Sequence, residues 1–192
     1  MLERVQSRSW LQDMDMGVHL HGAQKALAQW AIVDDYDNIL DMHCEDAQLL
    51  RYLAQKYSLR ACGIADDPEH ARALRNGFGD AEIFCARKED IPWRDESFDA
   101  VFYQMKKNEY GFSGGFMREA MRVLKPGGQM LMAVSGAPEA LHQAASLLGI
   151  GEADDHVKPA QILTAMEEAG FDDVSWRMAT PFISIAMGWK RS

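Results

Sequence analysis

A group of polar and reactive side chains follows directly after the first predicted strand. The apolar run 36–42 ends in His43, Cys44 and Glu45, and an apolar helical pattern begins at Leu49. In an open α/β sheet, the turn between the first strand and its helix is where a nucleotide-like ligand usually binds. Glycines normally let the backbone approach such a ligand and leave amide groups for it. This turn has none, so its chemistry decides whether the protein binds a cofactor.

Other reactive residues give weaker signals. Cys44, Cys62 and Cys85 are an odd number of cysteines without CxxC spacing, and we interpret them as reduced, buried thiols. A metal or redox site beside His43 is the alternative, but no ligand spacing supports it. The chain shows no Ser-His-Asp order and no nucleophile elbow, so no catalytic residue is assigned.

Length and composition predict one globular domain over residues 1–192. The chain is 47% hydrophobic and 26% charged, and its net charge is -9. This acidity argues against binding to nucleic-acid backbones or anionic membranes. No apolar run approaches the ~18 residues of a membrane span, and the charged N-terminus lacks a signal-peptide core. We therefore expect a cytoplasmic protein.

The elements that would position the turn alternate between strand and helix. Strands are predicted at 36–42, 59–65, 81–86, 98–104, 129–134, 173–179 and 182–189, and helices at 19–32, 46–57, 67–77, 115–124, 138–148 and 159–169. This order predicts a mostly parallel seven-stranded sheet with helices on both faces. A hairpin at Thr180-Pro181 makes one edge antiparallel. Residues 1–33 would form an N-terminal helical cap and residues 36–192 the sheet core.

Three stretches in this order resemble the class I S-adenosylmethionine-dependent methyltransferases, especially those with a type 11 domain. They are Ile39-Leu40-Asp41-Met42-x-Cys44, the stretch from Glu89 to Val101, and the stretch from Arg118 to Gly128. The resemblance covers roughly residues 30–190 and implies a three-layer Rossmann-like fold. The composition of the Lys-Pro-Gly-Gly segment at 125–128 can be explained by the fold, because proline ends a helix and glycine allows positive φ.

The resemblance places the cofactor's methionine part at the first turn. Asp41 and Cys44 match the family pattern, whereas His43, Glu45 and Ala47 occupy its three glycine positions. Glu45 adds a charge where the family binds a carboxylate, and two carboxylates ~4 Å apart repel by on the order of a few kcal/mol. Glu45 could instead pair with the cofactor's amino group.

The next landmark is the acidic residue that holds the ribose hydroxyls at the end of the second strand. The family shows Gly-apolar-Asp, and this chain has Gly63-Ile64-Ala65. Ala65 therefore stands at the expected place without an acid. Asp66, one residue later, is the predicted substitute.

The third landmark is an acid that reaches the adenine amino group after the third strand. Arg87 occupies its place, and a guanidinium has donors only, so it would have to stack on the ring instead. Glu89 and Asp90 are nearby substitutes. Two further residues complete the predicted cofactor-binding set. They are Lys88, next to Arg87, and Gln104, at the end of the fourth predicted strand.

The sequence leaves three functions open. The first is an S-adenosylmethionine-dependent methyltransferase acting on an unknown small molecule, as a monomer or homodimer. The second is a pseudoenzyme of the same fold that has lost the cofactor and serves as a binding or regulatory partner. The third is a pocket for a small anionic ligand, favoured by Arg87 and by Lys106-Lys107.

Overall fold

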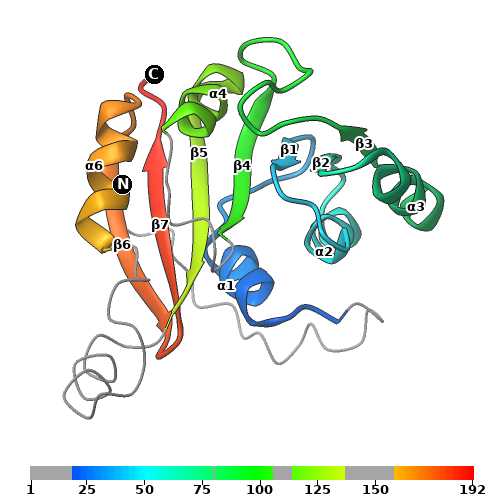
Figure 1. Cartoon of the computed structure of the whole chain (residues 1–192), viewed down its shortest axis with the longest axis horizontal. Coiled ribbons are helices and arrows are strands. Elements are labelled where there is room, and N and C mark those ends of the chain that lie inside the picture. The colour runs from blue at the N-terminus through cyan, green and yellow to red at the C-terminus, as the bar shows by residue number, and fades with distance from the viewer. Residues whose placement is uncertain (1–18, 80, 106–113, 137–157) are drawn as a thin grey trace.

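A seven-stranded sheet forms the centre of the protein (Figure 1). The computed structural model describes residues 19–79, 81–105, 114–136 and 158–192. The strand order is β3-β2-β1-β4-β5-β7-β6. The strands are β1 Asn38–Asp41, β2 Arg60–Ala65, β3 Glu82–Cys85, β4 Phe98–Met105, β5 Leu124–Ser135, β6 Asp172–Thr180 and β7 Ile183–Trp189. The first five are parallel, and β7 runs antiparallel to β5 and β6, which confirms the predicted fold.

Helices cover both faces of the sheet. Their bounds are α1 Gly22–Trp30, α2 Gln48–Lys56, α3 Pro68–Phe78, α4 Gly115–Val123 and α6 Pro159–Glu168. One apolar cluster joins α1, α2 and α3 to one face, and a second joins α4 and α6 to the other. Ile39 packs into the first cluster and Leu40 into the second, because successive strand residues point to opposite faces. The result is a three-layer architecture.

Helix α3 begins where the sequence predicts, but it ends one residue later than predicted. Asp67 caps α3 by accepting a hydrogen bond from the His70 amide at 2.8 Å, as its position before a proline predicts. The predicted end at Gly77 is wrong, since the helix continues to Phe78 and Gly79 follows with a φ of 68°. Gly79 is the glycine that adopts a positive φ, which favours glycine, and the helix ends there.

Two further predictions need correction. Strand β5 begins at Leu124, not at Gln129, because Leu124 already pairs with Phe98 before an irregular register. Cys85 is exposed at the edge strand β3, whereas Cys44 and Cys62 are buried as expected. The predicted helix 138–148 and most of the N-terminal cap lie outside the described residues.

Candidate functional site

A pocket opens at the ends of β1, β2, β3 and β4. Its volume is about 170 Å³, and it is lined by Met42, His43, Ile64, Asp66, Ala86, Arg87, Lys88, Glu89 and Tyr103. Because the strands are parallel, their carboxyl ends meet at one edge of the sheet, which is where ligands bind in this architecture. The structure therefore gathers five of the predicted site residues, which are His43, Asp66, Arg87, Lys88 and Glu89.

The other predicted residues do not line this pocket. Asp41, Cys44, Ala65 and Gln104 are buried beneath it or beside it, and Glu45 is exposed. The sequence reasoning in turn missed the apolar walls contributed by Met42, Ile64, Ala86 and Tyr103. Their signal was available, because each lies near the carboxyl end of a predicted strand.

His43 fills part of the space at the first turn. Its side chain is 9% exposed, and its Nδ1 lies 2.8 Å from the backbone oxygen of Gln104. A carbonyl only accepts, so this contact assigns a proton to Nδ1. Nε2 lies 3.9 Å from the Asp66 Oδ2 atom, and the ring is tilted against Tyr103 at 6.1 Å. An imidazole thus links the ends of β1, β2 and β4 where the family pattern has a glycine.

Asp41 supports this arrangement from below. Its buried Oδ1 accepts a hydrogen bond from the His43 amide at 3.0 Å. Burial raises the pKa of the Asp41 carboxyl to about 6, while the hydrogen bond and the charge of His43 act in the opposite direction. The carboxylate therefore holds the turn and does not face the pocket.

The backbone amides of the first turn are largely used within the protein. The Cys44 amide donates to the Ile64 oxygen at 2.9 Å, and the Gln48 amide to Asp46 Oδ1 at 3.0 Å. The Ala47 amide hydrogen-bonds the Cys44 thiol, whose pKa is raised by burial. Together with the His43 amide, these groups are no longer available to a ligand, in contrast to the amides of a glycine-rich turn.

The remaining two glycine positions differ from each other. Ala47 has a φ of 54°, so its backbone keeps the left-handed conformation that favours glycine. Glu45 is exposed and does not line the pocket, and its backbone oxygen lies 2.7 Å from His70 Nε2. The repulsion between Glu45 and a cofactor carboxylate stays a prediction.

Basic side chains line the side of the pocket contributed by residues 86–89. Lys88 Nζ donates to the Tyr103 hydroxyl at 2.7 Å and lies over the Tyr103 and Phe116 rings, at 5.1 and 5.5 Å. Arg87 has an 83% exposed side chain, and its Nε lies 3.7 Å from Glu89 Oε2. At the position where the resemblance predicts an acid for the adenine amino group, the structure therefore has an exposed Arg87 beside Glu89.

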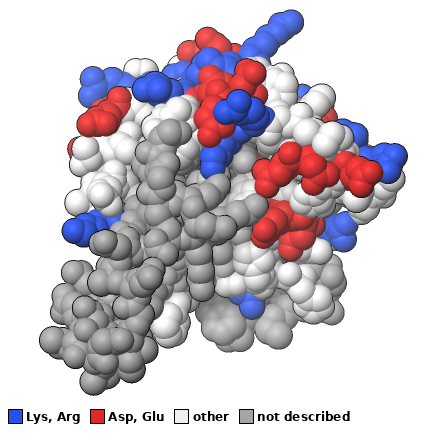
Figure 2. Space-filling view, viewed as in Figure 1, with Lys and Arg blue, Asp and Glu red and all other residues white. Residues whose placement is uncertain are grey.

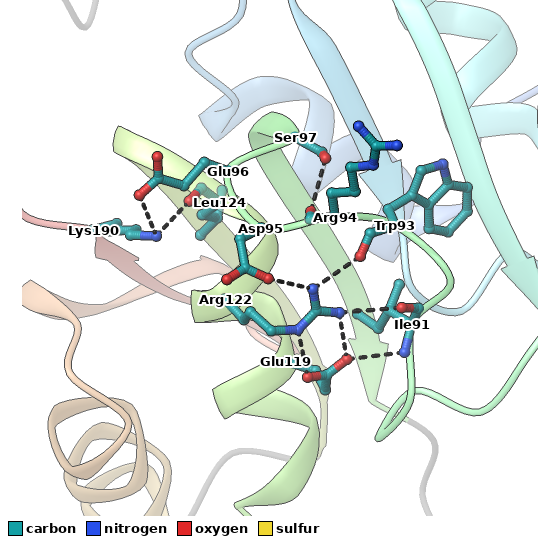
Figure 3. A network of polar contacts seen from close by, with 10 residues as sticks. All are labelled: Ile91, Trp93, Arg94, Asp95, Glu96, Ser97, Glu119, Arg122, Leu124 and Lys190. Atoms are coloured by element: carbon teal, nitrogen blue, oxygen red, sulfur yellow. Dashed lines mark hydrogen bonds and ion pairs between the residues drawn. The ribbon is translucent and has the colours of Figure 1, made fainter.

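Two of the three family-like stretches contact each other beside this wall (Figure 3). Arg122 donates to the backbone oxygens of Ile91 and Trp93 and pairs with Glu119 and Asp95. Glu119 also accepts from the Ile91 amide at 2.9 Å. These bonds tie the 91–95 turn to α4. The turn continues directly from residues 86–89, so the network fixes the chain that forms the pocket wall.

Within the described ranges, no group of three or more His, Cys, Asp or Glu side chains could hold a metal ion. No helix in that part of the chain is long and apolar enough to span a bilayer. Figure 2 shows acidic side chains beside α2 and α3 and a mixture of both signs around α4.

Comparisons with known proteins agree on the fold. Residues 40–132 match the family model of a methyltransferase domain of type 11. A chain from the complex between the Haloferax volcanii Trm112 methyltransferase activator and a methyltransferase is 22% identical, with a TM-score of 0.67 over 88% of this chain and 89% of that chain. A SAM-dependent methyltransferase from Aquifex aeolicus is 16% identical, with a TM-score of 0.69 over 93% and 95%.

Another solved structure of the same fold carries a different name. The cyclase SpnF is 17% identical, with a TM-score of 0.70 over 88% of this chain and 79% of its own. At such identities the likeness shows the architecture alone, and the reaction has to be argued from the pocket.

Proposed function

Because residues 40–132 match the family model of a methyltransferase domain, we propose that this chain is an S-adenosylmethionine-dependent methyltransferase. The cofactor would occupy the pocket at the ends of β1, β2 and β4, and the acceptor would be a small molecule. The observation that carries this proposal is the Asp66 carboxylate in the pocket wall, one residue beyond the end of β2.

The residues present fit much of such a cofactor. Asp66 offers carboxylate oxygens to a ribose diol, and Met42, Ile64 and Ala86 offer apolar surface to an adenine ring.

Bound S-adenosylmethionine supplies an activated methyl group, and such enzymes act mostly by aligning donor and acceptor. Asp66 would orient the cofactor, and the Arg122 network would keep the 86–89 wall in place. His43 would restrict the space at the turn. No residue of this chain is assigned as a general base.

A second function has an observation of its own. The turn amides are paired internally, His43 occupies a glycine position, and the volume of about 170 Å³ lies below the roughly 300–1,000 Å³ of ordinary ligand pockets. These features favour a protein that has lost the cofactor and acts as a binding partner. Arg87 and Lys88 at the rim leave a small anionic ligand as the third candidate.

Calorimetry with S-adenosylmethionine and S-adenosylhomocysteine separates these functions. The enzyme proposal expects micromolar binding, weakened about tenfold by Asp66→Asn through loss of a charge-assisted hydrogen bond. Asp173→Asn, a change at an exposed carboxylate on β6 outside the pocket, is the matched control. Absence of heat at millimolar cofactor would overturn the enzyme proposal and leave the binding function.

A triple variant, His43→Gly with Glu45→Gly and Ala47→Gly, tests why the glycines are missing. A decayed enzyme gains cofactor affinity in this variant. Unchanged affinity means that the pocket has been rebuilt for another ligand.

We propose that residues 1–192 act as one domain in the cytoplasm, as a monomer or homodimer. Light scattering on the purified protein tests the oligomeric state. The Haloferax volcanii structure contains an activator protein, so the same measurement in the presence of a co-purifying protein would test for a partner.

A further inference from the structure

The His43 imidazole offers one ring nitrogen to the pocket at the ends of β1, β2, β3 and β4. Its Nδ1 carries a proton, because this atom lies 2.8 Å from the backbone oxygen of Gln104. In the neutral ring the other nitrogen, Nε2, is therefore an acceptor. Its distance of 3.9 Å from Asp66 Oδ2 is longer than a hydrogen bond, and no described residue donates to it. The first turn thus holds an acceptor that the fold does not use.

This acceptor is open to the pocket. Within the described ranges, three side-chain atoms are buried without a hydrogen-bond partner, and they are Trp30 Nε1, Gln104 Nε2 and Gln129 Oε1. His43 Nε2 also lacks a partner but is not one of these atoms, so it keeps accessible surface. Both His43 and Asp66 line the pocket, and the Asp66 side chain is 70% exposed. The accessible surface of Nε2 therefore belongs to the pocket wall beside Asp66.

Asp66 provides a second acceptor next to the first. An ionised carboxylate has two oxygens with about four lone-pair positions and no donor. The Asp66 carboxylate comes from the end of β2 and the His43 ring from the end of β1, and their facing atoms are 3.9 Å apart. Two acceptors this close, with no hydrogen bond between them, match a ligand that carries two adjacent donors.

The charges of the pocket wall favour uncharged donors. Asp66 and Glu89 are acidic, and Arg87 and Lys88 are basic, so the four charges cancel. An anion at this place would meet the Asp66 carboxylate and a nitrogen lone pair, and a cation would meet the two basic side chains. Hydroxyl groups donate hydrogen bonds without adding a charge. Two neighbouring hydroxyl groups of a sugar therefore suit the pair of acceptors better than an ion does.

We propose that His43 Nε2 and Asp66 together hold the vicinal diol of a ribose, with one hydroxyl group on each residue. This inference rests on the proposed function, because S-adenosylmethionine brings such a ribose to the pocket. His43 then decides which sugars the pocket accepts, and it makes a ligand contact at a position where the family pattern has a glycine. A 2′-deoxyribose or a 3′-deoxyribose would lose one of the two bonds.

Calorimetry with adenosine, 2′-deoxyadenosine and 3′-deoxyadenosine tests the diol site, at about pH 8, where imidazole groups are ordinarily neutral. The wild-type protein should bind adenosine about tenfold more tightly than either deoxy compound, because each lacks one hydrogen bond. His43→Asn keeps an amide donor for the Gln104 oxygen and removes the Nε2 acceptor. In this variant one deoxy compound should bind as tightly as adenosine, while the other is still rejected.

Asp66→Ala is the complementary variant, at an exposed position that does not depend on the buried ring. It should abolish rejection of the second deoxy compound and keep rejection of the first, through His43. His19→Asn, at an exposed histidine outside the pocket, should leave all three affinities unchanged. Each result is a ratio of affinities within one variant, and a general loss of folding would lower all three affinities alike. The thermal midpoint of each variant is measured in parallel.

Three results would each overturn the proposal. They are equal binding of the three nucleosides by the wild-type protein, no saturation by adenosine at millimolar concentration, and rejection of both deoxy compounds by His43→Asn or of neither by Asp66→Ala. Titration with S-adenosylmethionine separates this inference from the proposed function. Cofactor binding with unchanged rejection in His43→Asn contradicts the diol site alone. Rejection of the deoxy compounds without cofactor binding contradicts the methyltransferase function alone.

Discussion

Two turns of this protein occupy places where methyltransferase-like sequences show glycine, and only one of them has kept it. In the connection from α4 into β5, a side chain on Gly128 would lie 2.9 Å from the Lys125 oxygen and 3.0 Å from the Asp99 oxygen. In the first turn, from Met42 to Ala47, side chains are present at all these places, and Ala47 tolerates a φ of 54°.

The difference separates what the fold needs from what a ligand needs. Gly128 packs backbone against backbone, where no side chain fits. The first turn holds its shape through Asp41 and His43 without glycine, so the fold itself does not require glycine there. A match to the family in the connection therefore supports the architecture, and cofactor binding has to be tested at the first turn.

Gly128→Ala should have the largest effect on stability. The added methyl group clashes with two backbone oxygens, and overpacking of this kind costs about 3 kcal/mol. Urea unfolding measures the change. Gly77→Ala is the matched control, because that position is exposed on α3 with nothing within 4 Å, and we expect a gain of about 0.5–1 kcal/mol. Similar losses in both variants would contradict the proposed role of Gly128.

Asp41 makes the first turn sensitive to pH. Its folded pKa of about 6 exceeds the ordinary value of 3.8, so the native state binds the proton more tightly than the unfolded chain does. The free energy of unfolding should therefore fall as the pH rises from about 4 to 6, by on the order of 2–3 kcal/mol. Asp41→Asn should remove this part of the pH dependence in urea unfolding. An unchanged pH profile in the variant would show that another group titrates there.

The fold was predictable because its signals are local and repeated. Alternating apolar segments define β1 to β4, and Asp67-Pro68 marks the beginning of α3. The end of α3 was harder, since Gly77 and Gly79 both suit a helix end and only the backbone conformation at Gly79 decides. The beginning of β5 was missed because it depends on pairing with Phe98, a contact distant in sequence.

The site was predictable to the level of strand ends, and no further. Which residues follow each strand can be read from the sequence, and five of them do line the pocket. The directions of their side chains depend on partners in other strands. His43 bonds to Gln104 across the sheet, and Lys88 reaches Tyr103. No local pattern encodes these contacts.

Arg122→Met tests how the 91–95 turn is held against α4. The substitution removes donors to the oxygens of Ile91 and Trp93, and it leaves Glu119 without its basic partner, with only the Ile91 amide still donating to it. Since the side chain is 30% exposed, water offsets part of this loss, and we expect a cost of about 1–2 kcal/mol in urea unfolding. Arg118→Met, at an exposed arginine of the same helix, should cost less than about 0.5 kcal/mol. Equal costs would mean that the network does not hold the 91–95 turn.

Ala47→Gly should have the smallest effect, and it tests the first turn most directly. Glycine relieves a left-handed alanine by about 1 kcal/mol, and removal of the buried methyl group costs about 0.8 kcal/mol. The unfolding free energy should therefore change by less than about 0.5 kcal/mol. Ala71→Gly, at a buried helical position, should lose about 2 kcal/mol in the same assay. A loss at Ala47 as large as that at Ala71 would show that the alanine is required by packing. A near-zero change would leave the cofactor as the reason for glycine at this position in related sequences.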